Sequence, residues 1–312
     1  MKTTLRRSSA ALLPVLFATV LPVLFATLLP VLFATPAPAQ QEKDPEAAQA
    51  GAQQGADLAA AMRAQFDQEK VRVDLDAGTV TVPAVAIEPP DPIEYALIHR
   101  RGKKHEAMFF TESKPSVLNA ALLLLGLEPG RNATYREKDP PPTLQEIENG
   151  ADPVIVTPPE GTPFWITVKW TGADGKVEQH CIEDLIGDLT TQEAVQDASW
   201  IYLGGRMARL YKDDPEVFVA DFEGNLVSVC YLSPDNHLGT MRHERARDDQ
   251  NWWLTRLMPP VGTEVEFVFH RRPGPLHAAR AERLKKAAAG EGEGGSKDAE
   301  PAEPGAPRGG GN

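Results

Sequence analysis

The stretch from Asp91 to Gly130 constrains the fold of this chain more than any other segment. Two runs rich in aromatic and aliphatic residues, 94–100 and 105–111, flank a short basic turn that contains Gly102. A glycine at the first position of a two-residue turn suits the type II′ geometry, whose twist matches that of antiparallel strands. We therefore expect a β-hairpin that is central in the fold, because both of its faces carry apolar residues. The register with the better apolar match pairs Leu97 with Met108, Tyr95 with Phe110, and His99 with Glu106.

An apolar helix is predicted directly after this hairpin. Pro115 is tolerated in its first turn, and Gly126 ends it. Residues 117–125 are almost all Ala and Leu, and a helix that is apolar on every side but too short to span a bilayer belongs in a protein core. The expected fold class is α+β, a single domain of mostly antiparallel β-hairpins packed on one buried helix at about residues 115–126.

Turn signals divide the rest of the domain into further elements. Hairpins are expected at residues 71–82, 164–182 and 218–232, strands at 200–203 and 264–270, and helices at 57–66, 251–258 and 275–289. The segment from 128 to 163 is rich in proline and predicts a long loop. A loop of this length in a compact domain is usually either functional or disordered.

The first 39 residues have the pattern of an export signal. A basic start with Lys2, Arg6 and Arg7 precedes a long apolar run, and Ala37-Pro38-Ala39 predicts cleavage after Ala39. The alternative is a retained membrane anchor, which the repeated prolines of the apolar run disfavour. We expect a bacterial periplasmic or secreted protein with no transmembrane segment after signal removal, or a membrane-anchored one if the signal is not cleaved.

Composition changes divide the rest of the chain. The predicted parts are an Ala/Gln-rich linker at 40–70, a folded domain at 71–272, a basic helical segment at 273–289 and a disordered tail at 290–312. Of the 32 basic and 44 acidic residues in the chain, signal cleavage removes three basic ones, which leaves a net charge of −15. So acidic a chain is a poor candidate for binding nucleic acid, and its expected partner is an unknown protein or small ligand of the cell envelope.

The central stretch also carries a resemblance. The sequence IEYALIHRRGKKHEAMFFTESKPSVLNAALLLLGLEPG resembles the opening motif of the YdjY-type domain family of bacterial exported proteins. Residues 200–205 and 218–232 resemble the second half of that family, and the resemblance covers about residues 71–271. It implies an exported domain of unknown function. Some members are labelled ferredoxin-like, but Cys181 and Cys230 are too few to hold an iron–sulfur cluster, so we expect no cofactor.

The candidate ligand-binding residues lie in and around the basic turn. In the expected register His99 and Glu106 are cross-strand neighbours, with His105 and Glu112 nearby. A histidine beside a carboxylate can act as a general base or ligate a metal, but neighbouring cations would repel a metal, so we expect none there. The alternative is a surface ion pair at the end of a hairpin.

Arg100, Arg101 and the two lysines that follow can be interpreted in two ways. Four cations around a glycine could bind a phosphate or carboxylate. The alternative, which is more common, is a solvated turn that protects a sheet edge from aggregation.

Cys181 and Cys230 form the one possible disulfide if the protein is exported. The alternative is that both are small buried apolar residues on separate strands.

No nucleophile elbow, phosphate-binding loop, dinucleotide fingerprint or complete zinc-protease motif is present. The leading hypothesis is therefore a non-enzymatic module that binds a ligand or protein. The alternatives are a metal- or histidine-dependent hydrolase and a structural protein of the envelope.

Overall fold

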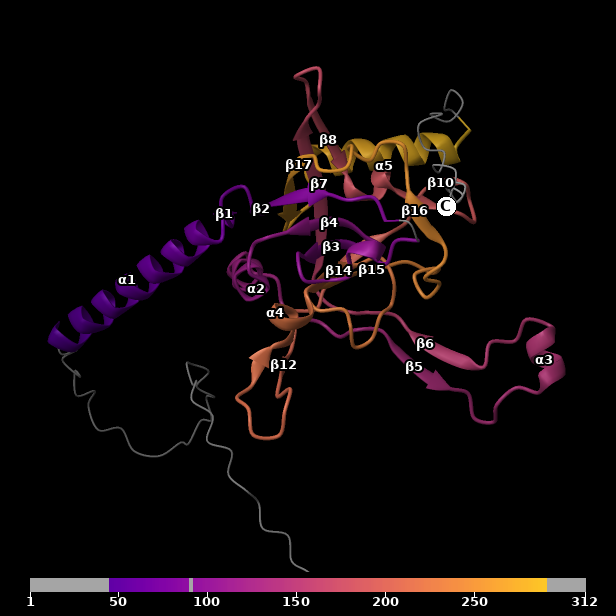
Figure 1. Ribbon diagram of the computed structural model, residues 1–312, viewed down its shortest axis with the longest axis horizontal. Coiled ribbons are helices and arrows are strands. Elements are labelled where there is room, and N and C mark those ends of the chain that lie inside the picture. Colours follow the sequence, from indigo (N-terminus) through magenta and orange to yellow (C-terminus); the bar gives the residue numbers. More distant parts are fainter. Residues whose placement is uncertain (1–44, 90–91, 291–312) are drawn as a thin grey trace, which may run out of the picture. The chain divides into compact units, whose positions relative to one another are not determined.

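The computed structural model describes residues 45–89 and 92–290. Eight of the ten strands of its main sheet form a ring: β2 (Thr79–Ala86), β3 (Tyr95–His99), β4 (Ala107–Thr111), β7 (Pro163–Thr171), β11 (Ser199–Tyr202), β14 (Asn225–Ser228), β15 (Gly239–Arg242) and β17 (Glu264–His270). They pair in the order β2-β17-β7-β11-β15-β14-β3-β4, and β4 pairs again with β2 (Figure 1). These eight strands therefore form a closed barrel. The predicted architecture, hairpins packed on one buried helix, is wrong.

Aromatic and aliphatic side chains fill the barrel. Alternate residues of β2 and β17, among them Val82, Phe267 and Phe269, are fully buried, as expected for strands with one face toward a core. Phe109 of β4 meets Phe267 edge to face, with ring centroids 5.9 Å apart. The fully buried Trp200 lies against Phe164 of β7. The barrel interior is thus a packed hydrophobic core.

The predicted hairpin at residues 94–111 is wrong, because β3 and β4 run parallel. His99 lies beside Thr111 instead of Glu106. The connection, which includes the short helix η1 (Lys104–Glu106), folds back over β3. A Cβ on Gly102 would lie 2.9 Å from the Ile98 Cβ and 2.7 Å from the Gly224 carbonyl oxygen. Gly102 therefore allows a close crossing between two segments and does not form a hairpin turn.

Parallel pairing gives each of these two strands a second neighbour. β3 pairs with β14, and β4 pairs with β2 over Val85–Phe110 and Ala86–Phe109. All five residues of β3 are buried, and a second apolar cluster of Tyr95, Ile98 and Ala107 lies apart from the main core. The expectation that this segment is central and covered on both faces is confirmed.

The helix α2 (Pro115–Leu124) is amphipathic and not buried on every side. Leu118, Ala121 and Leu122 belong to the main core. Leu123 and Leu124, by contrast, are 44% and 46% exposed. The predicted helix therefore exists, but it covers part of the barrel core with one face only.

The predictions of several shorter elements are confirmed. These are the hairpin of β1 (Arg72–Asp74) with β2, the hairpin of β7 with β8 (Val177–Cys181), the strands β11 and β17, and the helices α1 (Pro45–Gln68) and α5 (Pro275–Ala288). The predicted hairpin at 218–232 is wrong, because α4 (Val219–Glu223) precedes β14. The predicted helix at 251–258 is also wrong, because β16 (Trp252–Leu254) pairs with β9 (Ile186–Asp188).

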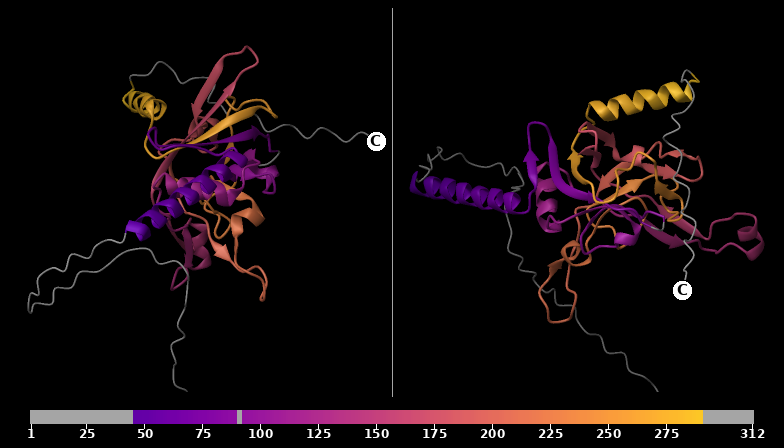
Figure 2. Two further views of the ribbon diagram at one scale, coloured as in Figure 1. Left: turned by 90° about the vertical axis from the view of Figure 1, so that its left-hand side faces the viewer. Right: turned by 45° about the horizontal axis from the view of Figure 1, so that its top comes forward.

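The Pro-rich segment predicted as a loop has structure of its own. It forms an arm of two antiparallel strands, β5 (Thr134–Glu137) and β6 (Val154–Thr157), with the helix α3 (Leu144–Glu148) between them (Figure 2). The remaining elements are η2 (Ile182–Leu185), β10 (Glu193–Ala194), β12 (Met207–Ala208) and β13 (Val217–Phe218).

The predicted export signal, its cleavage after Ala39 and most of the predicted tail lie outside the described residues. Among the helices of residues 45–89 and 92–290, none has the length and apolar character needed to cross a membrane.

Candidate functional site

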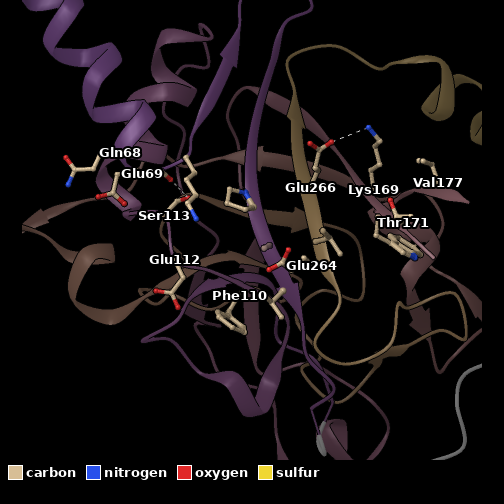
Figure 3. A pocket seen from close by; sticks show the side chains of 16 residues that line it. Gln68, Glu69, Phe110, Glu112, Ser113, Lys169, Thr171, Val177, Glu264 and Glu266 are labelled. Atoms are coloured by element: carbon tan, nitrogen blue, oxygen red, sulfur yellow. Dashed lines mark hydrogen bonds and ion pairs between the residues drawn. The ribbon is translucent and has the colours of Figure 1, made fainter. Parts of the chain in front are cut away.

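A groove of about 610 Å³ lies on the outer face of the barrel wall, over β4, β2, β17 and β7 (Figure 3). Its floor includes Pro83, Val85 and Phe110, which point outward because the alternate residues of the same strands fill the core. The C-terminal end of α1 and the β7–β8 hairpin also contribute to its lining. The groove thus combines a rigid apolar floor with polar edges.

Pro83 lies beneath this groove, at the point where β2 changes its pairing partner. β2 pairs with β1 over residues 79–81 and with β4 only over 85–86, so Pro83 lies between the two pairings. Proline has no N–H group to leave unpaired, and the Thr111 hydroxyl donates to the Pro83 carbonyl oxygen at 2.7 Å. At Pro83, between the pairings of β2 with β1 and with β4, no backbone group is therefore left without a hydrogen-bond partner, although the β-ladder is interrupted there.

Four carboxylates and two ammonium groups line the groove: Glu69, Glu112, Glu264, Glu266, Lys70 and Lys169. Glu112 pairs with Arg100 at 3.2 Å, and the Lys114 N–H donates to Glu69 at 2.8 Å. Glu266 pairs with Arg72 and with Lys169, and although burial opposes its ionisation, these partners hold its pKa below the usual value. Among the described residues, Glu264 is the lining carboxylate with no hydrogen bond or ion pair.

The structure separates the site residues predicted from the sequence. Arg100 and Glu112 lie together at the groove. His105 and Glu106 pair with each other at 3.2 Å at the opposite end of β4. His99 is buried, and this burial, reinforced by the nearby Arg101, lowers its pKa. The pair of His99 with Glu106 that the hairpin register predicted is not formed, because the strands are parallel.

A second carboxylate, Glu94, joins Glu106 in a way the sequence did not indicate. Both residues directly precede parallel strands, and the Glu94 N–H donates to the Glu106 carbonyl oxygen at 2.8 Å. Lys103 Nζ lies 3.4 Å from a Glu94 carboxyl oxygen and 3.5 Å from one of Glu106. Burial and a hydrogen bond with the Glu106 side chain raise the pKa of Glu94 to about 7. Only the parallel register brings these two carboxyl groups together.

The basic run 100–104 is largely occupied by contacts within the chain. Arg100 and Lys103 pair with carboxylates, and the Lys104 ammonium lies 4.4 Å from the centre of the Phe110 ring. Such a cation–π contact suits an exposed lysine beside a half-buried aromatic ring. These contacts favour an ion-paired surface over an anion site.

Cys181 and Cys230 are free and both buried. Burial raises the pKa of the Cys181 thiol to about 12, which keeps it protonated and unreactive near neutral pH. Across residues 45–89 and 92–290, no three His, Cys, Asp or Glu side chains gather in a way that could hold a metal ion.

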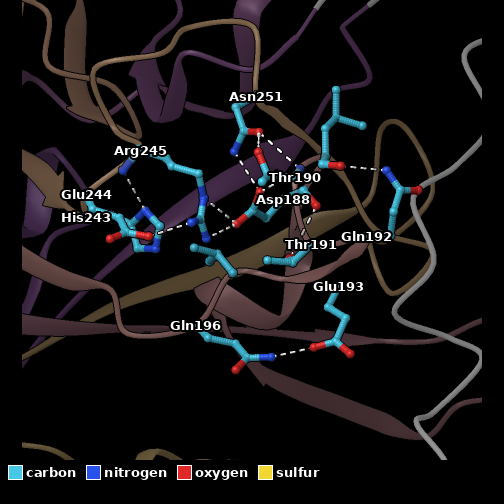
Figure 4. A network of polar contacts seen from close by, with 12 residues as sticks. Asp188, Thr190, Thr191, Gln192, Glu193, Gln196, His243, Glu244, Arg245 and Asn251 are labelled. Atoms are coloured by element: carbon cyan, nitrogen blue, oxygen red, sulfur yellow. Dashed lines mark hydrogen bonds and ion pairs between the residues drawn. The ribbon is translucent and has the colours of Figure 1, made fainter. Parts of the chain in front are cut away.

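A polar network that the sequence did not reveal surrounds Asp188 (Figure 4). The Arg245 guanidinium donates to one Asp188 oxygen at 3.0 and 2.6 Å, and Asn251 donates to the other at 2.8 Å. The Thr190 N–H also donates to Asp188, at 2.9 Å. Since Asp188 is buried and accepts bonds at both oxygens, the network ties β9 to the segment before β16 and offers no free carboxylate to a ligand.

The sequence profile of the YdjY domain matches residues 71–270, which begin just before β1 and end with the last residue of β17. The chain belongs to the YdjY domain family. The whole barrel, the arm and the outer groove floor therefore lie inside the YdjY domain, whose function is unknown. No curated protein and no solved structure matches the chain.

Proposed function

We propose that this YdjY domain is an exported binding module that holds its ligand in the outer groove of the barrel and catalyses no reaction. The groove of about 610 Å³ is the observation that carries the proposal. Ligand sites of this size usually combine an apolar surface with a few polar groups that fix orientation. Pro83, Val85 and Phe110 provide the apolar surface, and Glu264 provides a charge that is not already used.

The ligand class follows from these groups. Glu264 is exposed at the edge of the floor, beside Val85 in the β2–β17 ladder. An ammonium or guanidinium group there would gain an ion pair, and the attached apolar body would cover Val85 and Phe110. An extended segment of polypeptide with a basic and an apolar side chain at positions i and i+2 meets both requirements, because those two side chains lie on the same face of the strand.

Binding is tested by calorimetry with two synthetic octapeptides, one with two Lys-Ser-Val-Ser repeats and one with two Glu-Ser-Val-Ser repeats, so that the charged and apolar side chains share one face of the extended chain. We expect the lysine peptide to bind and the glutamate peptide not to bind. Glu264→Gln should weaken binding of the lysine peptide about twofold to fivefold, since an exposed ion pair contributes up to about 1 kcal/mol. Glu216→Gln removes an exposed carboxylate from outside the groove and is the matched control. Equal affinity for both peptides, or equal loss in both variants, would overturn the proposal.

The proposal that the protein is exported depends on residues 1–39 and is tested separately from binding. The full chain is expressed in a bacterium and the mature protein is recovered from the periplasm or the medium. We expect a mature N-terminus at Gln40, measured by mass spectrometry of the intact protein. Retention of Met1 in a cytoplasmic fraction would contradict export without affecting the binding test.

A further inference from the structure

The end of the arm exposes apolar side chains that the rest of the described chain does not cover. On the tip helix α3, Leu144 is 80% exposed and Ile147 is 41% exposed. The two residues are three apart in a helix and so lie on the same side of it. Figure 1 and the right-hand view of Figure 2 show α3 at the end of the arm, standing out from the barrel.

The tip is held in one conformation. Three prolines, 140–142, lead into α3, and proline fixes the backbone angle φ. A capping box then starts the helix, in which the Thr143 N–H donates to the Glu146 carboxylate at 2.7 Å and the Glu146 N–H donates to the Thr143 hydroxyl at 3.3 Å. An apolar pair on a rigid support has little conformational entropy to lose on binding, as a docking element requires.

The base of the arm is equally fixed. The Tyr135 hydroxyl of β5 donates to the Tyr231 carbonyl oxygen at 2.8 Å, and Arg131 pairs with Glu160 at 2.7 Å. Asp152 forms an ion pair with Arg247. The ion pair of Arg131 with Glu160 joins the two sides of the arm, and the contacts of Tyr135 and Asp152 fasten it to the barrel. The exposure of Leu144 shows that the tip does not fill a groove among the described residues of its own chain.

A surface that complements the tip exists on the same chain. A groove of about 550 Å³ lies between α1 and the β1 hairpin. Its apolar lining is formed by Ala59, Met62, Phe66, Val71, Val73, Leu75 and Leu124. Leu75 and Leu124 are 59% and 46% exposed, so the groove presents an open apolar surface. This groove, called the α1–β1 groove below, is separate from the outer groove of the proposed function.

The charges of the two surfaces are also complementary. Arg63 and Arg72 line the α1–β1 groove with a single carboxylate, Asp67. The tip helix carries Glu146 and Glu148 and no basic residue. The geometry points to the α1–β1 groove of a second copy of this chain as the docking site of the arm tip. Leu144 and Ile147 enter the apolar groove, and Glu148 faces Arg63, because Arg72 already pairs with Glu266 and Glu146 already binds Thr143.

The geometry of this contact determines which kinds of assembly can form. The tip and the groove are different surfaces, so each copy offers one of each and the contact is head to tail. Repeated in one direction, such contacts build rings or open chains, and two copies that each insert a tip into the other form a closed dimer with two equal contacts. A tip of two apolar residues buries less area than a stable dimer interface, so the association is weak and depends strongly on protein concentration.

Sedimentation velocity over a series of protein concentrations tests the assembly. We expect the sedimentation coefficient of the wild-type protein to rise with concentration. Leu144→Asp disables the tip, Leu75→Asp disables the groove, and each variant alone should stay monomeric at every concentration. Both positions are exposed, so both variants should keep the melting temperature of the wild type. Leu210→Asp changes a leucine outside both surfaces that is 37% exposed, and it should assemble like the wild type.

Mixing the two disabled variants decides between this contact and nonspecific association. Leu75→Asp supplies an intact tip and Leu144→Asp an intact groove, so an equal mixture should form a one-to-one dimer and nothing larger. A wild-type protein that stays monomeric throughout overturns the proposal and assigns the tip to a different partner. Assembly of Leu144→Asp alone, or a mixture that stays monomeric, overturns it as well.

Discussion

The carboxyl groups of Glu94 and Glu106 lie on the same ammonium at the start of two parallel strands, with Lys103 Nζ 3.4 Å from the first and 3.5 Å from the second. Two carboxyl groups so close cannot both ionise without repulsion, so one of them holds its proton into the neutral range. Glu94 is that group, because burial and the bond to Glu106 raise its pKa to about 7. The folded protein therefore binds a proton that the unfolded chain has already released.

The first prediction concerns stability against pH. Between the ordinary glutamate pKa of 4.5 and the folded value of about 7, the unfolded chain loses the Glu94 proton while the folded protein keeps it. Raising the pH through this window therefore lowers the free energy of unfolding. Glu94→Gln keeps a neutral hydrogen-bonding group and should flatten this decline, as measured by urea unfolding from pH 4 to pH 8. Identical pH profiles for the variant and the wild type would contradict the raised pKa.

The second prediction tests the close crossing at Gly102. A Cβ there would meet the Gly224 carbonyl oxygen at 2.7 Å, and backbone atoms cannot move aside easily. Gly102→Ala should destabilise the fold by about 1–3 kcal/mol, the usual cost of overpacking. Gly55→Ala is the matched control, because a Cβ at Gly55 has no atom within 4 Å. Equal unfolding midpoints for Gly102→Ala and the wild type would show that residues 100–106 do not lie against β3 and α4.

The same glycine shows how far the fold could be predicted from the sequence. Local patterns located most strands, and apolar residues on both faces of 94–111 correctly placed that segment in the centre. The pairing of β3 and β4 could not be predicted, because a glycine between two apolar runs has the same local signature in a turn and in a close crossing. Pairings with β14 and β2, more than 100 and about 20 residues away in sequence, decide between them. Closure of the barrel likewise depends on strand pairing over long sequence distances, which no short stretch of the sequence indicates.

The candidate site was predicted only in part for the same reason. Glu112 was named as a candidate, and it lines the outer groove. Glu264 and Val85 were not named, because exposed strand residues carry no motif until β17 and β2 lie side by side. Asp188 and Arg245 are 57 residues apart, and nothing in either local sequence indicates their contact. These charged residues are brought together by the order in which the strands pair, and the spacing of residue types along the sequence does not indicate that order.

The third prediction concerns Asp188. Burial opposes the ionisation of its carboxyl group, but hydrogen bonds from Asn251 and Arg245 outweigh it and lower its pKa. The hydrogen bonds to the ionised Asp188 carboxylate therefore stabilise the fold fully at a pH above the pKa that Asp188 has in the unfolded chain. This stabilisation is lost as the pH falls through the lower pKa that Asp188 has in the folded protein. Asp188→Ala leaves the Arg245 guanidinium without this partner and should cost about 3 kcal/mol at neutral pH, the lower end for a broken buried pair. Urea unfolding measures the loss.

A matched control for Asp188 lies on the neighbouring strand β10. Glu193 is exposed and its carboxylate accepts a hydrogen bond from the half-buried Gln196 side chain, so Glu193→Ala should change stability by less than about 0.5 kcal/mol. A loss in Asp188→Ala no larger than in this control would mean that the network does not stabilise the barrel.

The fourth prediction concerns His270 on the outer face of β17. Burial, together with the neighbouring His277, lowers the pKa of His270 to about 4, and its Nε2 lies 2.8 Å from the Thr167 hydroxyl. As the pH falls from 6.5 toward 4, the unfolded chain binds a proton at His270 that the folded protein does not. The free energy of unfolding therefore falls on acidification, opposite in sign to the contribution of Glu94. His270→Gln keeps a partner for Thr167 and should lose less stability than the wild type between pH 6.5 and pH 4. A His270→Gln profile that follows the wild-type profile would contradict the lowered pKa.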